Sequence, residues 1–437
     1  MGIWFVCIAL VVLSRFIPMA YSSEYDYIDI SNPFLKKIPI AIPPFIVESF
    51  DQTHKQVAAE SSDLLSSSLE FTGYFKLLDR GAFLIDPNTD WAGQGIEFKN
   101  WTVTGAEMLI IGRVSIQDTI ITMELRLYDT FKERMIVGKR YKGWLGDQRK
   151  IIHRFCSEVI YVLTGDRGVF NSKIAFVTKK KASKEIVICE FDGHNPKYFT
   201  NNKKINLTPA WSSDGKWIAY TSYLRGRPDL YIRHVKDKHG TVVSKKGINT
   251  TPAWVPGKFS LAATLSFSGD PEIYLLTGSG KIIKRLTRSY GIDVSPSWSP
   301  DGKKFAFVSN RSGSPQIYIK DMESGRVERL TYEGNYNTSP SWSPKGDRIA
   351  YSGMNNGNFD IFVIDVNTGA LLQLTANQRD NESPSWSPDG SLITFSTTRE
   401  GPSRIYVMTA IGTDQRRLLA MEGEQTNPDW SQSAPNY

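Results

Sequence analysis

A tryptophan-centred phrase that returns at a nearly constant interval limits how this chain can fold. The phrase Ser-Pro-Ser-Trp-Ser-Pro-Asp-Gly occupies residues 295–302 and recurs at 383–390, with one Asp-to-Lys change at 339–346. Weaker copies surround Trp211 and Trp254, and a truncated copy surrounds Trp430. The six tryptophans are 43, 44, 44, 44 and 44 residues apart. A fixed period of this size is typical of a β-propeller or a solenoid.

Each repeat contains enough apolar segments for four short strands. A segment such as 305–307 follows the tryptophan, a second such as 317–319 comes next, and most units close with Leu-Thr, as at 330–331. The Pro-Asp-Gly of the phrase suits a type I turn followed by a left-handed residue. Four strands in about 44 residues predict a propeller blade. We expect each tryptophan to pack between blades rather than to bind a ligand.

The two ends of the repeat region complement each other. Residues 173–177 resemble a second strand that has no tryptophan strand before it, and residues 426–431 form a tryptophan strand with nothing after it. The last strand should therefore complete the blade that begins at Lys173, which gives six blades and leaves no free sheet edge.

Residues 23–165 follow a different pattern, which predicts a separate α+β domain. Amphipathic helices are expected at 51–69 and 147–163, with Asp147 as N-cap and Gly165 as terminator. Strands are expected at 38–42, 75–78, 107–116, 120–128 and 134–141. The predicted fold class is multidomain, with a small N-terminal α+β domain followed by a six-bladed β-propeller at 166–437 that the C-terminal strand closes.

The first 22 residues predict a signal peptide. Residues 3–13 are apolar but too few to span a bilayer, and Ala20 and Ser22 are small residues suited to cleavage after Ser22. A retained anchor is the alternative. Cys156 and Cys189 would then remain in the exported chain, and we interpret them as two separate buried thiols rather than as a disulfide.

The net charge of +7 does not indicate nucleic-acid binding. Basic residues are scattered, and the densest run, 179–181, is interpreted as a solvated hairpin tip. No nucleic-acid motif is present, so no nucleic-acid partner is expected. A basic chain of this kind is equally suited to work near anionic lipid or cell-wall polymer.

The sequence offers no set of residues typical of catalysis. The five histidines have no metal-ligand spacing, and His234 and His239 are interpreted as exposed polar residues of a turn. No Gly-x-Ser-x-Gly elbow and no phosphate-binding glycine loop occurs. We therefore predict no catalytic residue, no metal and no cofactor. The alternative is a secreted propeller hydrolase or lyase that acts on cell-wall or oligosaccharide substrates.

Binding is expected on one face of the propeller. The loops that enter the tryptophan strands and the loops that join the second and third strands should open on the same face, which we call the loop face. Rigid scaffolds commonly present their binding residues on such loops. The candidate residues there are Ile248, Asn249, Thr251, Asp293, Val294, Asn337, Thr338, Asp380 and Asn381.

Three further stretches carry a resemblance to a known family. They are Phe-Thr-Gly-Tyr-Phe-Lys-Leu-Leu-Asp-Arg at 71–80, Gly-Ala-Glu-Met-Leu-Ile-Ile-Gly-Arg-Val at 105–114, and Leu-Thr-Gly-Asp-Arg-Gly-Val-Phe at 163–170. With the propeller phrase, they resemble the TolB family of periplasmic components of the Gram-negative Tol-Pal system. The likeness covers the whole chain after residue 22.

The resemblance implies a non-enzymatic, monomeric periplasmic adaptor that supports outer-membrane integrity and cell division. It implies that the lipoprotein Pal binds the propeller face, with Ile248, Asn249, Thr251 and Val294 carried over as contacts. It also implies that a TolA-like inner-membrane protein binds the N-terminal segment at 23–32, and that the outer membrane is reached only through partners. The candidate residues of that segment are Tyr25, Asp26, Tyr27, Ile28, Asp29 and Ile30.

Overall fold

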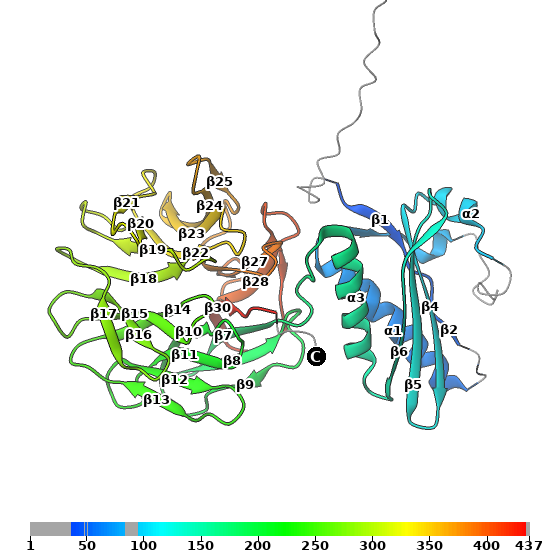
Figure 1. The fold of residues 1–437 in the computed structure, drawn as a ribbon, viewed down its shortest axis with the longest axis horizontal. Helices are drawn as coiled ribbons and strands as arrows, with labels where there is room; N and C mark the ends of the chain where they lie inside the picture. Colours follow the sequence, from blue (N-terminus) through cyan, green and yellow to red (C-terminus); the bar gives the residue numbers. More distant parts are fainter. Residues whose placement is uncertain (1–35, 48, 50, 84–94, 434–437) are drawn as a thin grey trace, which may run out of the picture.

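The protein consists of an α+β part and a propeller that lie side by side (Figure 1). The structure is a computed structural model that describes residues 36–47, 49, 51–83 and 95–433. The predicted signal peptide and the segment at 23–32 lie outside the described residues. None of the helices among the described residues is both long and apolar enough to cross a membrane.

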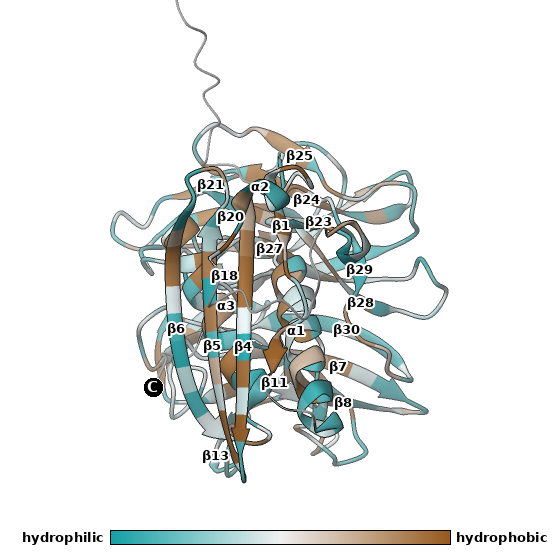
Figure 2. Ribbon diagram, turned by 90° about the vertical axis from the view of Figure 1, so that its right-hand side faces the viewer, coloured by the Kyte–Doolittle hydropathy of each residue, from teal (hydrophilic) through white to brown (hydrophobic). Residues whose placement is uncertain are grey.

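The N-terminal part is built on one mixed sheet with the strand order β3-β1-β4-β5-β6, and β2 pairs with β4. The strands β4, β5 and β6 form an antiparallel meander, whereas β1 is parallel to both of its neighbours. Figure 2 shows the meander strands next to one another. The strands are β1 (Ile38–Ala41), β2 (Ile46–Val47), β3 (Phe75–Leu77), β4 (Met108–Gln117), β5 (Ile120–Asp129) and β6 (Arg134–Trp144).

Two long helices pack against this sheet, α1 (Gln52–Phe71) and α3 (Gln148–Thr164). The short α2 (Phe98–Thr102) carries Trp101, which packs with Ala41 of β1 and Leu109 of β4 in a separate cluster. The α1 helix begins at Asp51, whose side chain accepts a 2.7 Å hydrogen bond from the backbone N–H of Thr53. The α3 helix ends at Gly165, whose φ of 83° confirms the predicted terminator. Asp147 precedes α3, but its carboxylate accepts from the N–H of Trp144 and not from a helix N–H.

The propeller has six four-stranded blades, as the sequence predicts. In the first blade β30 (Glu424–Trp430) pairs antiparallel with β7 (Lys173–Lys180), which places Trp430 opposite Ile174 and confirms closure by the C-terminal strand. The remaining strands of that blade are β8 (Ser183–Glu190) and β9 (Lys197–Tyr198). The other blades are β10 (Asn206–Trp211), β11 (Trp217–Ser222), β12 (Asp229–His234) and β13 (Gly240–Val243); β14 (Asn249–Trp254), β15 (Ser260–Leu265), β16 (Glu272–Thr277) and β17 (Ile282–Arg285); β18 (Asp293–Trp298), β19 (Lys304–Ser309), β20 (Gln316–Asp321) and β21 (Val327–Arg329); β22 (Asn337–Trp342), β23 (Arg348–Asn355), β24 (Asn358–Asp365) and β25 (Leu371–Gln373); β26 (Asn381–Trp386), β27 (Leu392–Thr397), β28 (Arg404–Thr409) and β29 (Arg416–Arg417).

The repeated tryptophans link neighbouring blades. The indole N–H of Trp254 donates to the carbonyl oxygen of Ala210 in the preceding blade at 3.1 Å, and Trp386 donates to Ser341 in the same way at 3.0 Å. All six rings are buried. Burial of one such side chain stabilises the fold by about 1.5–3 kcal/mol. The recurring phrase is therefore scaffold, as expected.

The two parts share a hydrophobic core. Residues of α3 pack with Phe170, Phe191 and Leu418, the last two from the first and sixth blades. The guanidinium group of Arg149 in α3 binds the carboxylates of Glu190 and Asp192 at 2.6 and 2.7 Å. These contacts fix the N-terminal part against the propeller.

Both cysteines of the described chain are buried free thiols. Cys156 lies in α3 and Cys189 in β8. Burial raises the pKa of both thiols, so both remain protonated.

Candidate binding face of the propeller

The structure places the two predicted sets of loops at one end of the blades. Asn249, the first residue of β14, lies opposite Leu265, the last residue of β15, and Asp293 lies opposite Ser309, the last residue of β19, in the same manner. The loop that enters each tryptophan strand therefore lies beside the loop that joins the second and third strands. The N-terminal part contacts the other ends of the first and sixth blades, at Glu190, Asp192 and Asp414. The loop face is consequently left open.

Four of the nine candidate side chains do not lie on this face. Asn249, Asp293, Asn337 and Asn381 are 0 to 1 % exposed, although each is the first residue of a tryptophan strand. The expectation that these side chains contact a partner directly does not agree with their burial.

The reason is a hydrogen-bond network that joins neighbouring blades. The side-chain amide of Asn337 donates to Gln316 Oε1 at 2.8 Å, and Thr331 donates to the same oxygen at 2.7 Å. At the following junction, Asn381 of the sixth blade donates to Asp360 of the fifth blade at 3.1 Å, and Thr375 donates to the same carboxylate at 2.9 Å. Buried polar groups must be paired in this way, because an unpaired group costs about 1–3 kcal/mol. An asparagine, an aspartate or a glutamine occupies this position in every blade, and that repetition indicates a structural role.

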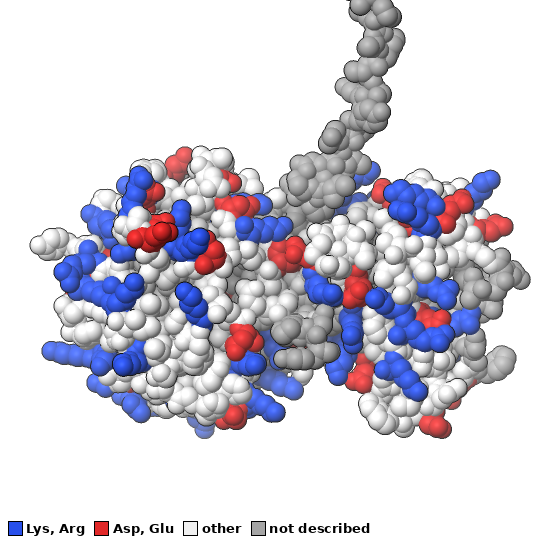
Figure 3. All heavy atoms as spheres, in the orientation of Figure 1, with Lys and Arg blue, Asp and Glu red and all other residues white. Residues whose placement is uncertain are grey.

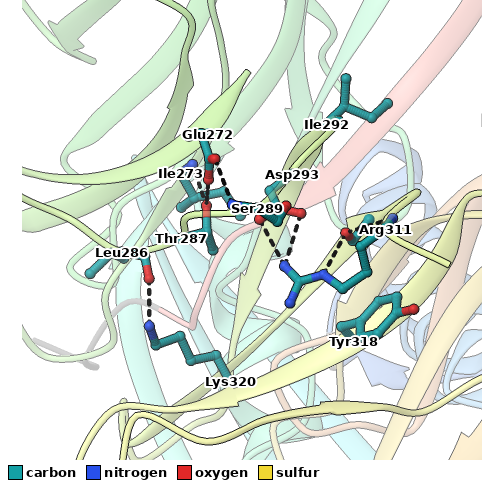
Figure 4. Close-up of polar contacts among 12 residues, drawn as sticks. Glu272, Ile273, Leu286, Thr287, Ser289, Ile292, Asp293, Arg311, Tyr318 and Lys320 are labelled. Carbon is teal, nitrogen blue, oxygen red and sulfur yellow. Dashed lines mark hydrogen bonds and ion pairs between the residues drawn. The ribbon is translucent and has the colours of Figure 1, made fainter. Parts of the chain in front are cut away.

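The junction of the third and fourth blades shows a charged version of the network (Figure 4). The carboxylate of Glu272 accepts from Thr287 at 2.5 Å and from the N–H of Ser289 at 2.9 Å. Asp293 takes the place of the asparagine and binds the guanidinium group of Arg311 at 2.9 Å. Arg311 lies over the Tyr318 ring, 5.0 Å from its centroid. Both buried carboxylates are therefore paired with cations or hydrogen-bond donors.

The other five candidates, Ile248, Thr251, Val294, Thr338 and Asp380, are partly exposed. Ile248 donates its N–H to Ser266 Oγ at 2.9 Å, so its loop is held to the neighbouring hairpin. Thr251 has a φ of 44°, and the residue before the repeated proline has a positive φ in all six blades. This unusual backbone accompanies a bulge in each tryptophan strand and belongs to the scaffold.

A second set of residues, which sequence reasoning missed, is strongly exposed on the loop face. Tyr290 is 96 % exposed and Tyr332 is 73 % exposed, and both precede tryptophan strands. Five other apolar or aromatic side chains are exposed in loops of this face or at strand ends beside them: Ile205, Leu224, Phe267, Tyr336 and Met354. Exposed aromatic residues are enriched at protein–protein interfaces. In the sequence, these residues differ from blade to blade, whereas the scaffold residues repeat. That difference could have identified them.

An acidic corner lies at the start of the sixth blade. Burial raises the pKa of Glu382, and the charge of Asp380 raises it further. Burial also raises the pKa of Asp360, although Thr375 and Asn381 oppose the shift through hydrogen bonds. These carboxyls hold protons more readily than ordinary surface acids.

The axial cavity of the propeller has a volume of about 670 Å³ and is lined by the tryptophan strands of all six blades. Asp429 is the single carboxylate among the described residues that line it. Glycoside hydrolysis generally requires two carboxyl groups that flank the bond. The described cavity lining does not supply that pair.

Charges of both signs are interspersed over the two parts, with Lys and Arg in excess (Figure 3). No single-sign surface dominates the side shown in that view. The loop face carries exposed apolar and aromatic side chains in addition to its charged residues.

Comparison with known proteins gives matches over both parts. Residues 26–136 match the TolB amino-terminal domain, and residues 161–434 match the TolB beta propeller domain. The Tol-Pal system protein TolB of Desulfosudis oleivorans is 60% identical over 285 residues, which are 64% of this chain and 65% of that protein. The Tol-Pal system protein TolB of Syntrophus aciditrophicus is 40% identical over 47% of each chain. These alignments thus span less than two thirds of the relatives' lengths.

A solved structure extends the likeness to nearly the whole chain. The crystal structure of TolB from Acinetobacter baumannii has a TM-score of 0.80 and 30% identity, and the match covers 91% of this chain and 97% of that chain. Both the α+β part and the propeller are therefore accounted for by one known architecture, and the chain belongs to the TolB family.

Proposed function

We propose that the protein is a non-enzymatic periplasmic adaptor of the Tol-Pal system. In this proposal Pal binds the loop face, and a TolA-like inner-membrane protein binds the segment at 23–32. The adaptor would then support outer-membrane integrity and constriction during cell division. The names of the curated relatives, which are Tol-Pal system proteins, support the assignment to this system.

The observation that carries the proposal is the set of exposed aromatic side chains on a rigid face. Tyr290, Tyr332 and Tyr336 project from loops that hydrogen bonds hold in place: Ser289 N–H donates to Glu272, and the Asn337 side chain donates to the carbonyl of Glu333. Rigid aromatic side chains bury much area with little loss of conformational entropy, which is why they dominate binding energies. Partly exposed candidates such as Val294 and Thr338 lie directly after the loops that carry these tyrosines.

The alternative, a hydrolase or lyase acting on wall or oligosaccharide substrates, has weaker support. The described lining of the axial cavity contains one carboxylate, Asp429, which is occupied by a hydrogen bond from the N–H of Trp211. A screen of the purified protein for hydrolysis of wall fragments tests this alternative directly.

The test of the loop face uses the Pal protein from the same organism. Calorimetric titration of the Tyr290→Ser/Tyr332→Ser variant should show affinity reduced by about tenfold or more. Tyr198→Ser is the matched control, because Tyr198 is 50 % exposed but lies on the outer strand β9. Equal affinity of the tyrosine variant and the wild type would contradict this use of the face.

The N-terminal segment needs a separate experiment. Removal of residues 23–32 should abolish binding of the TolA-like partner and change the affinity for Pal, as expected for a strand that moves between its own protein and a partner. If neither affinity changed, the proposed switch would have no support.

A further inference from the structure

The turn between β12 and β13, in the second blade, brings two histidines and an aspartate together. His234 Nδ1 lies 3.0 Å from Asp237 Oδ1, and His239 Nδ1 hydrogen-bonds to the same oxygen. One ligand atom from each residue lies within 4.8 Å of the others. The cluster is at the rim of the propeller and belongs to no part of the loop face.

The backbone of the turn holds this arrangement. The N–H of Lys238 donates to the carbonyl of His234 at 3.0 Å, and the N–H of His234 donates to the carbonyl of His239 at 2.9 Å. Lys238 has a φ of 62°, which turns the chain back so that residues three and five positions apart meet. Asp237 is itself anchored, because its Oδ1 accepts from the N–H of His239 at 3.2 Å.

Aromatic packing limits the motion of both imidazoles. The Trp217 ring lies edge to face with His234 at 5.1 Å and with His239 at 4.8 Å between centroids. Phe259, from the next blade, covers Trp217 at 5.2 Å. Because the two imidazole side chains are already restricted, they lose less conformational entropy when they bind another group.

The other blades do not have this arrangement. In the fourth and fifth blades the position of His234 is Asp321 and Asp365, and each accepts two backbone N–H groups of its own turn. The residue across the ladder from these acids is Lys304 or Arg348, whereas in the second blade it is Trp217. In the second blade an imidazole thus stands where the fourth and fifth blades have the acid, and a second imidazole, a carboxylate and Trp217 lie beside it.

We propose that His234, Asp237 and His239 form a binding site for a divalent transition-metal ion, of which zinc is the closest chemical match. Two imidazole nitrogens and one carboxylate oxygen are a donor set that suits Zn²⁺, and metal–ligand distances of about 2.0–2.2 Å place tetrahedral ligands about 3.3 Å apart. The atoms of the turn can reach that spacing by small side-chain rotations. Three protein ligands leave a fourth position open to water or to a donor from a partner. Coordination through Nδ1 requires each neutral imidazole to carry its proton on Nε2, so bonds to the metal replace the contacts between the imidazoles and Asp237.

This site goes beyond the proposed adaptor role and does not depend on it. The test is calorimetric titration of the chelator-treated, full-length protein with ZnCl₂ in a non-coordinating buffer, together with melting curves with and without zinc. The wild type should bind one equivalent at this site and melt at a higher temperature with zinc. His239→Ala and the gentler His239→Gln should each weaken this binding by about tenfold or more.

The matched control is His194→Ala, because His194 lies in the corresponding turn of the first blade beside Asp192. That variant should bind zinc as the wild type does. The proposal is overturned if the wild type takes up no zinc, or if the His239 variants retain full affinity, since the cluster is then only a carboxylate hydrogen-bonded to two imidazoles.

Discussion

The carboxylate of Asp429, in the last strand of the chain, accepts a 2.7 Å hydrogen bond from the backbone N–H of Trp211 in the second blade. Between other blades a serine makes the equivalent link, with Ser297 Oγ accepting from Trp342 at 2.9 Å. Ser385 accepts from Trp430 in the same way. Of these three links, only the one made by Asp429 has an ionisable acceptor. Burial raises the pKa of Asp429 to about 7.

This pKa predicts how Asp429 affects stability. Between pH 3.8 and about 7 the folded protein holds a proton that the unfolded chain has released, so the stabilising contribution at low pH is lost as pH rises through this window. Asp429→Ser removes the ionisation and restores the link of the other blades. We compare the melting temperature of the variant with that of the wild type at each pH. The advantage of the variant should be about 2–4 °C larger at pH 8 than at pH 4. Thermal unfolding followed by circular dichroism at both pH values measures this; a pH-independent difference would contradict the assignment.

Removal of residues 424–437 takes away the whole of β30. The strand β7 then loses its partner and the first blade an entire face of packing, so the propeller should melt at a much lower temperature. Removal of 434–437 alone is the control, because it leaves β30 in place. An unchanged melting curve for the longer deletion would be incompatible with closure by this strand.

Asn337 tests the distinction between scaffold and surface. Asn337→Ala removes the donors to Gln316 Oε1 and to the carbonyl of Glu333 from a site that is 1 % exposed. The free energy of unfolding should fall by about 1–3 kcal/mol. The neighbouring Thr338→Ala, at a partly exposed position, should change it by less than about 0.5 kcal/mol. Urea unfolding measures both, and equal losses would argue against a structural role limited to the asparagine.

His153 should make the domain junction sensitive to acid. Its ring packs edge to face on Phe191 at 5.0 Å, and burial, aided by the charge of Arg149, lowers its pKa to about 4. The unfolded chain takes up a proton near pH 6.5, so stability present at neutral pH is lost as pH falls from 6.5 towards 4. In His153→Phe the loss between pH 7.5 and 5 should be smaller by about 1–2 kcal/mol. The midpoints of urea unfolding at the two pH values measure this loss. Identical losses in both proteins would show that His153 contributes nothing to the pH dependence of stability.

The sequence predicts the propeller well because its determinants are local and repeated. The period of the tryptophans, the Pro-Asp-Gly turns and the incomplete repeat at Lys173 together define six blades and their closure. In the N-terminal part five of the six strands are predicted from the sequence, but the short β2 and the order of the strands are not. The parallel pairing of β1 with both β3 and β4 joins residues far apart in the chain, and no local pattern encodes it.

The candidate site was harder to predict for a related reason. Asn337 and Asn381 occupy predicted loop ends, yet the inter-blade network buries them, and that network involves residues about twenty positions away. Tyr290 and Tyr332 are single residues in variable loops, and only the fold shows that they share a face. The His234 cluster depends on the left-handed backbone conformation of Lys238. The spacing of the histidines in the sequence does not indicate that conformation.

The position of β30 at the very end of the chain has a consequence for biogenesis. The first blade begins at Lys173, but its innermost strand is supplied by residues 424–430, which the ribosome makes about 250 residues later. A nascent chain therefore cannot complete the first blade or close the ring until residues 424–430 have been made. A chain shortened within β30 would leave β7 without its partner strand, so closure of the ring depends on a strand that is synthesised after all the other strands of the propeller.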